Sequence, residues 1–129
     1  IMDKTSSNAN LTVYENIYFW IKLFSSSRSI KEIESILDLL SLYQHKKSLV
    51  GSLSYGEIKK LELARLIIEQ KKVWVLDEPY IGLDQISTNL INETIIYHTK
   101  LGGMVIFTSH IPADIPNLEI LQLEKYENN

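Results

Sequence analysis

The chain has 129 residues, 45% of them hydrophobic, which is enough to bury the core of one ordinary domain. Its formal net charge is -3 and no basic run is longer than two lysines, so its charge gives no reason to expect nucleic-acid binding. Cysteine is absent, which excludes disulfides and thiolate metal sites formed by these residues. No apolar run approaches the roughly 20 residues that a membrane-spanning helix needs.

Apolar residues recur at helical spacing in the first half of the chain, and each such run starts with the same polar pattern. The pattern is Thr/Ser-x-x-Glu, the capping box in which two side chains satisfy backbone N–H groups at the start of a helix. It occurs at Thr12, Ser29 and Ser54. We therefore expect helices that start after these three residues, the last of them running to about Gln70. Because the spacing recurs, it gives little reason by itself to assign Ser54 a role beyond capping.

The second half of the chain alternates short apolar runs with one long helical run. Strands are predicted over three ranges, 72–79, 104–110 and 118–125. A helix is expected over 85–100, ended by the Gly102-Gly103 pair. Strand, helix, strand is typical of a parallel βαβ unit that is buried on both faces. The sequence thus predicts an α/β fold, with a helical part over 1–65 and an α/β part over 66–129.

Three ionisable side chains are expected at one edge of this sheet. Asp77 and Glu78 end the first predicted strand and His110 ends the second, and α/β proteins bind ligands at the carboxyl ends of their parallel strands. The two acids either end a strand in solvent, or bind magnesium and activate a water molecule for phosphoryl transfer. The histidine either makes a structural hydrogen bond or contacts a phosphate. Gly82 and Asp84 are locally typical of a turn and a helix cap.

Taken in chain order, these stretches resemble the second half of an ATP-binding cassette ATPase, over roughly residues 11–123. The stretches are LSYGE, KKLELAR, VWVLDEP, IGLD and FTSH, in the spacing that this family uses. The resemblance implies a partial P-loop NTPase fold, in which a helical subdomain is followed by a parallel βαβ core. Within the family, LTVYENIYFW and LGGMVIFTSH look most like the ATP-binding subunits that export haem for cytochrome c biogenesis.

The resemblance gives the LSYGE stretch a specific role. Ser54, Tyr55, Gly56 and Glu57 match the signature motif, usually LSGGQ, which faces the ATP bound by a second subunit. Tyr55 replaces a residue that is usually small, and Glu57 replaces the usual glutamine. Both departures fall where the resemblance places the phosphates of the second subunit's nucleotide.

The resemblance also assigns roles at the sheet edge, with ATP and Mg²⁺ as the cofactors. Asp77 matches the Walker B aspartate that contacts magnesium, directly or through water. Glu78 matches the catalytic glutamate and His110 the switch histidine. The D-loop is matched by Gly82, Leu83 and Asp84. The two other histidines, His45 and His98, receive no role.

By the same resemblance, the partners are a second ATPase subunit and integral membrane permease subunits, which would select the transported substrate. The chain would then lie peripherally on the cytoplasmic face of an inner membrane, or on the matrix side of a mitochondrial inner membrane. On the first predicted helix, Tyr14, Tyr18, Phe19 and Trp20 either pack internally or line a groove for a permease helix.

The P-loop sequence G-x-x-x-x-G-K-[ST], which holds the phosphates of ATP, does not occur in these 129 residues. Gly51 and Gly56 have the right separation, but Glu57-Ile58 follows them in place of Lys-Ser/Thr. We expect that this chain alone binds ATP negligibly. Three interpretations stay open: part of a transporter ATPase, a non-catalytic half-cassette that docks on an intact ATPase, and part of a soluble cassette ATPase.

Overall fold

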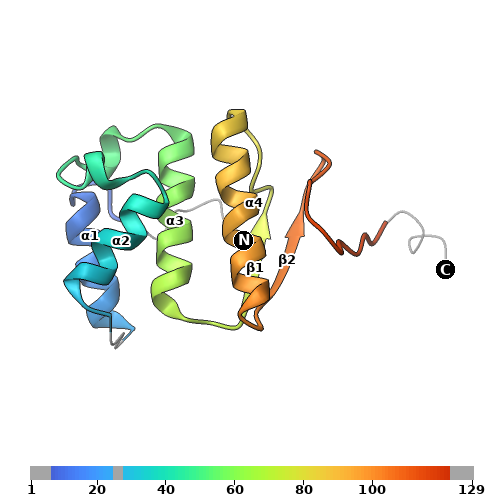
Figure 1. Ribbon diagram of the computed structural model, residues 1–129. Coiled ribbons are helices and arrows are strands. Elements are labelled where there is room, and N and C mark those ends of the chain that lie inside the picture. The colour runs from blue at the N-terminus through green and yellow to red at the C-terminus, as the bar shows by residue number, and fades with distance from the viewer. Residues whose placement is uncertain (1–6, 25–27, 123–129) are drawn as a thin grey trace.

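The computed structural model describes residues 7–24 and 28–122. These residues form two groups of elements that lie side by side (Figure 1). One group contains three helices and two short 3-10 turns, and the other contains one helix and two strands. In chain order the elements are α1 (Val13–Leu23), α2 (Ile30–Leu39), η1 (Tyr43–His45), η2 (Val50–Ser52), α3 (Tyr55–Glu69), β1 (Val73–Asp77), α4 (Gln85–Lys100) and β2 (Met104–Thr108).

The three predicted capping boxes are confirmed, because both bonds between the cap residue and its glutamate are present in each. They open α1 at Thr12, α2 at Ser29 and α3 at Ser54. At the other end of α3, Gln70 adopts a left-handed conformation and its N–H donates to the carbonyl of Leu66. The bounds of these helices are therefore set by local sequence, close to where the sequence predicted them.

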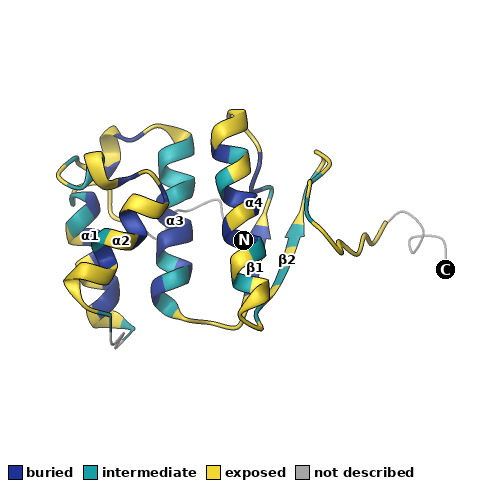
Figure 2. Cartoon of the chain, in the orientation of Figure 1, coloured by how far each residue is buried: buried dark blue, intermediate teal, exposed yellow. Residues whose placement is uncertain are grey.

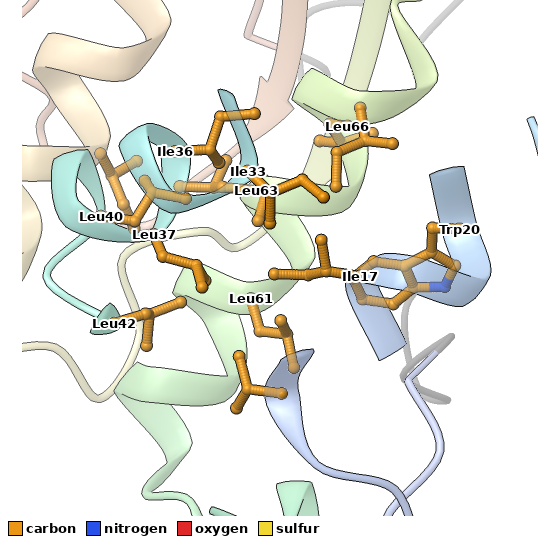
Figure 3. Packing of buried hydrophobic residues seen from close by; sticks show 14 of the residues in the cluster. Ile17, Trp20, Ile33, Ile36, Leu37, Leu40, Leu42, Leu61, Leu63 and Leu66 are labelled. Carbon is orange, nitrogen blue, oxygen red and sulfur yellow. The ribbon is translucent and has the colours of Figure 1, made fainter. Parts of the chain in front are cut away.

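Apolar side chains from α1, α2 and α3 form the core of the helical group (Figure 3). Ile17, Leu37 and Leu61, one from each helix, are 0% exposed. Asn16 is a buried polar residue beside them, and its amide exchanges hydrogen bonds of 2.8 and 3.1 Å with the main chain of Asn8. These bonds satisfy the buried amide and fix the segment that leads into α1.

The aromatic residues of α1 divide between the core and the surface. Trp20 is 2% exposed and points into the core, where Figure 3 shows its ring near Ile17. Tyr18 and Phe19 are 48% and 54% exposed. The suggestion that Trp20 lines a docking groove is therefore wrong, because its ring is part of the internal packing. Tyr14 is half-buried, so this residue and the two exposed rings are still accessible to a permease helix.

β1 and β2 pair in parallel, with Val73 opposite Met104 and Asp77 opposite Thr108. α4 connects them, which confirms the predicted βαβ unit. In Figure 1, α4 lies against the two strands, and α3 lies between α4 and the other helices. α4 begins after the Asp84 cap and has the predicted bounds. The register brings the carboxyl ends of both strands to the same edge of the sheet.

A stacked pair of rings fixes α4 to the sheet. The rings of Trp74 and His98 lie 3.7 Å apart at an interplanar angle of 8°, and Nε2 of His98 is 3.0 Å from the carbonyl oxygen of Lys72. Gly102 has a φ of +91°, in the region that favours glycine, and this allows the sharp turn after α4. At Gly103 a side chain would lie 2.2 Å from the ring of His98, so glycine is needed for this contact.

The opposite face of the sheet is exposed, and we call it the open sheet face. It consists of Val73, Val75, Met104 and Ile106, each of which is at least half exposed. In Figure 2, β2 carries only the colours of exposed and intermediate residues. The expectation that these strands are buried on both faces is wrong for the described residues. α4 covers the face that carries Trp74, and no other described element covers the open sheet face.

The strand predicted over 118–125 is also wrong as far as the structure describes it. Residues 118–122 form no strand, and 123–125 lie outside the described residues. The chain instead leads away from β2 (Figure 1), and Ile120 and Leu121 are each 74% exposed. An apolar run forms a strand only where a neighbouring strand and a surface to pack on are available.

The predicted division of the chain at residue 65 falls within α3, which continues to Glu69, and it stays a prediction. None of the helices in the described ranges is long and apolar enough to cross a membrane. The fold thus consists of a helical group joined through α3 to a βαβ unit, and the predicted site residues lie at the sheet edge and at the start of α3.

Candidate functional site

The predicted meeting of side chains at the carboxyl edge of the sheet is present. Asp77 at the end of β1 accepts a hydrogen bond of 2.5 Å at Oδ1 from the hydroxyl of Thr108 at the end of β2. The N–H of Glu78 donates to the hydroxyl oxygen and the carbonyl oxygen of Thr108, at 3.1 and 3.2 Å. Thr108 therefore holds both acids in place. The sequence analysis missed this residue, although it directly precedes Ser109 and His110 in the FTSH stretch.

Glu78 and His110 contact each other. Nε2 of His110 lies 3.2 Å from Oε1 of Glu78, and the main-chain N–H of His110 donates to Oε2 at 3.3 Å. The side chain of Glu78 is 21% exposed and that of His110 is 90% exposed. The carboxylate is thus partly sheltered while the imidazole faces solvent, where it could reach a ligand bound over the edge of the sheet.

The acidic edge fits a magnesium ion only if a ligand supplies most of its oxygens. Among the described residues no group of three or more His, Cys, Asp or Glu side chains is placed to hold a metal. Asp77 is exposed, and within the described ranges only its Oδ1 is hydrogen-bonded. Magnesium prefers six oxygen ligands and often keeps several waters, with one or two carboxylates and phosphates completing its shell. These residues therefore suit a metal that arrives with a phosphate ligand.

The start of α3 is a fully formed cap. The N–H of Glu57 donates to the hydroxyl oxygen of Ser54 at 3.2 Å, and the N–H of Ser54 donates to Oε2 of Glu57 at 2.8 Å. The other carboxylate oxygen lies 3.1 Å from Nε2 of His45, a residue to which the sequence analysis gave no role. The hydrogen bond from the Ser54 main chain, with a smaller effect from His45, lowers the pKa of Glu57.

Because Ser54 uses its oxygen as an acceptor in this cap, its hydroxyl hydrogen can still be donated outward. Ser54 and Tyr55 are exposed, and Gly56 is half-buried. The N-terminus of a helix favours anions, since its first N–H groups are unpaired and its dipole is positive there. The turn of residues 54–57, which we call the signature turn, can therefore serve both as a cap and as a phosphate-facing surface.

The signature turn packs against the turn that precedes α4. A side chain on Gly56 would lie 3.3 Å from Leu83, so the two turns are in close contact there. Gly82 has a φ of +73°, and a side chain on it would lie 3.1 Å from the ring of Tyr55. Asp84 caps α4 by accepting from the N–H of Ser87 at 2.7 Å, and this bond lowers the pKa of its carboxyl. The turn and the cap expected at 82–84 are confirmed.

The structure thus places the predicted site residues in two clusters that share one boundary. Asp77, Glu78 and His110 form the first cluster at the sheet edge. The signature turn and residues 82–84 form the second cluster. Lys59 of α3 connects the two, because its ammonium group donates to the main-chain carbonyl of Glu78. No pattern in the sequence pointed to Lys59.

Comparison with known proteins agrees with this arrangement. A family model described as "ABC transporter" matches residues 1–81. The chain is 34% identical over 118 residues to the cytochrome c biogenesis ATP-binding export protein CcmA of Cereibacter sphaeroides, covering 92% of this chain and 54% of that protein. It is 35% identical over 120 residues to ABC transporter I family member 1 of Arabidopsis thaliana, covering 93% and 51%. The chain spans about half the length of the curated relatives that it matches.

Solved structures show the fold. An ABC transporter ATP-binding protein from Pyrococcus furiosus matches with a TM-score of 0.72 at 20% identity, covering 88% of this chain and 56% of that one. The ADP conformation of an ATP-binding cassette of an ABC transporter matches with a TM-score of 0.62 at 22% identity, covering 81% and 47%. The expected α/β fold, a partial P-loop NTPase fold, is confirmed. Since the family model covers more than half of the sequence as well, the chain belongs to the ABC transporter family and matches its ATP-binding domain.

Proposed function

We propose that this chain supplies the signature turn and the hydrolytic edge of the ATP-binding subunit of an ABC transporter. The observation that carries the proposal is the contact of Glu78 with His110 beside the Asp77–Thr108 pair at the carboxyl edge of a parallel sheet. In a family whose ATPases hydrolyse ATP, this set provides a carboxylate, a solvent-facing imidazole and a magnesium-compatible acid at one place.

Each side chain has a distinct part in the proposed reaction. Glu78 accepts the proton of the attacking water, since its carboxylate is partly sheltered from solvent and contacts His110. His110 donates a hydrogen bond to the terminal phosphate, for which its exposed ring is suited. Asp77 would bind magnesium directly or through water, and Thr108 orients the Asp77 carboxylate. A bound magnesium ion would neutralise charge on the phosphate oxygens.

The signature turn acts on a different nucleotide in this proposal. Ser54 and Gly56 face the ATP of a second ATPase subunit, with Asp84 at the boundary between the two subunits. The exposed hydroxyl of Ser54 and the unpaired N–H groups of α3 support phosphate binding there. Two subunits would then form two composite sites, each with the acids of one chain and the signature turn of the other.

We propose haem export for cytochrome c maturation as the pathway, with membrane permease subunits as partners on the cytoplasmic face of an inner membrane. Relatives named for cytochrome c biogenesis and ATP-binding export support this choice. The mitochondrial alternative gains no support from them. Tyr18 and Phe19 are exposed apolar rings on α1 that a permease helix could cover.

Glu78→Gln tests the hydrolytic role. Because an amide cannot accept the proton of water, we expect kcat for ATP hydrolysis to fall by about 100-fold or more while ATP still binds. The P-loop is not among the 129 residues, so the assay uses the protein expressed from its complete native reading frame, with Mg²⁺. In the source organism, the native gene but not the variant should restore covalent haem in c-type cytochromes after deletion of the gene.

Glu93→Gln is the matched control, since Glu93 is an exposed glutamate on α4 outside both clusters. It should leave hydrolysis unchanged. Hydrolysis by the Glu78 variant at the wild-type rate would remove Glu78 from the role proposed for it.

A non-catalytic half-cassette is the second candidate. The observation that favours it is the signature turn itself, where Tyr55 covers Gly82 and Glu57 pairs with His45. A carboxylate there adds a negative charge next to the place where phosphates would lie. Under this alternative, the Glu78→Gln variant restores cytochrome c maturation as well as the native gene does.

A further inference from the structure

Glu78 has a main-chain conformation that needs support from its neighbours. Its φ is +45°, in the left-handed region that few residues other than glycine adopt. Such a conformation is strained and persists only where the surroundings hold it. The N–H of Glu78 is held by Thr108, and its side chain by His110. The remaining polar group is the carbonyl oxygen, which accepts from the N–H of Ile81 in the following turn at 3.4 Å and from Lys59 on a different element.

The signature turn orients the side chain of Lys59. Its ammonium group lies 5.0 Å from the centroid of the Tyr55 ring, one helical turn earlier on α3. This distance is within the roughly 6 Å over which a cation is attracted to an aromatic face. The ring in turn packs against Gly82. Lys59 is half-buried, so the contact is partly shielded from water.

We propose that Lys59 is a positioning residue that couples the signature turn to the catalytic carboxylate of the same chain. The ring of Tyr55 directs its ammonium group to the carbonyl of Glu78, and this bond keeps Glu78 in the conformation that presents its carboxylate to His110. Tyr55, where the family usually has a small residue, then has a function in this chain. A shift of the signature turn would be transmitted to the carboxylate through Lys59. This inference rests on the proposed ATPase function for its kinetic consequence only.

Lys59→Met removes the charge and keeps most of the apolar stem. In the protein from the complete native reading frame, we expect kcat for ATP hydrolysis to fall about tenfold, because a misdirected carboxylate loses its alignment with water. KM for ATP should stay within about twofold, since Lys59 contacts no nucleotide in this proposal. Lys59→Arg should restore most of the kcat. Tyr55→Ala should lower kcat in the same way, and the double variant should lose little more than Lys59→Met alone.

Lys22→Met is the matched control, since Lys22 on α1 lies 5.4 Å from the ring of Tyr18 and makes a similar contact outside both clusters. It should leave kcat and KM unchanged. A kcat for Lys59→Met within twofold of wild type, a loss confined to KM, or no rescue by arginine would each overturn the inference.

Amide hydrogen exchange tests the role of Lys59 independently of ATP hydrolysis. If the wild-type protein hydrolyses no ATP, that result contradicts the proposed function alone. The N–H groups of Ile81 and Leu83 donate within the turn that follows Glu78, to the carbonyls of Glu78 and Tyr80. Lys59→Met should speed their exchange about tenfold, as expected for local opening of that turn. Exchange at the wild-type rate would overturn the inference, and variants that fail to fold are recognised by faster exchange in α1 and α4 as well.

Discussion

Gly82 faces the ring of Tyr55 at a φ of +73°, so two separate effects oppose a side chain at this position. The first is backbone strain, which costs an alanine about 1–2 kcal/mol in the left-handed region. The second is the 3.1 Å approach to the ring. Gly102 shares only the first, because its φ is +91° and a side chain there would have no heavy atom within 4 Å.

Gly82→Ala should therefore lower the free energy of unfolding by more than Gly102→Ala does, since Tyr55 must also move. Urea denaturation measures both, and each should lose about 1 kcal/mol or more. Tyr55→Ala in the Gly82→Ala background should remove the difference between the two glycines. Equal losses at both positions would mean that the ring does not pack on Gly82.

Among single residues, the sequence predicted those site residues that directly follow or end a predicted strand. Asp77, Glu78 and His110 were expected together because they end neighbouring parallel strands. Thr108 and Lys59 were not expected. The part played by Thr108 depends on a strand register that places it opposite Asp77, and that of Lys59 depends on the packing of α3 against a turn 19 residues away.

The helix α3 begins with the same cap as α2, and this permits a comparison within one molecule. Ser54 and Ser29 each accept from the N–H of a glutamate three residues later, at 3.2 and 3.3 Å. Either serine replaced by alanine should cost about 1 kcal/mol of stability, since one cap bond is lost in each case. The two caps thus have equal structural value but lie in different surroundings.

Ser54→Ala should lower ATP hydrolysis at least tenfold, whereas Ser29→Ala should leave it unchanged at equal loss of stability. The reason is that only Ser54 also donates its hydroxyl to phosphate in the proposed function. Steady-state hydrolysis and urea denaturation of both variants measure this. Equal activity in the two variants would reduce Ser54 to a helix cap.

Elements with local sequence signals were predicted correctly, and so were the two strands that pair with each other, whereas the third predicted strand is absent over residues 118–122. The three capping boxes and the bounds of α4 needed only neighbouring residues. The strand expected over 118–125 had the right composition, but residues 118–122 find no strand to pair with in the described structure. Pairing is a property of the whole sheet, and sequence composition does not contain it.

Across the whole molecule, the open sheet face is an apolar surface that lies next to the sheet edge. Ile106 is 55% exposed there, and its neighbours on this face are also apolar. Contiguous apolar surface of this kind promotes association. We expect the 129-residue chain to bind a hydrophobic dye. Its average molecular mass in sedimentation experiments should increase with protein concentration.

Ile106→Lys should weaken both effects, because it places a charge on this apolar face. Ile86→Lys is the control, since Ile86 is 78% exposed on α4 and lies outside the open sheet face. It should leave dye binding and mass unchanged. If dye binding and mass decrease equally in both variants, the association does not depend on the open sheet face.

In the proposed function, Ser54 acts on the nucleotide of the second subunit while Glu78 acts on that of its own. Dimers of two differently tagged subunits from the complete native reading frame test it directly. With Ser54→Ala on one subunit and Glu78→Gln on the other, one composite site stays intact, so about half of the wild-type ATP hydrolysis should remain. With both substitutions on one subunit, both sites are damaged and hydrolysis should be almost lost. If hydrolysis instead survives only when both substitutions are on one subunit, Ser54 and Glu78 act on the same nucleotide and the proposed function is wrong.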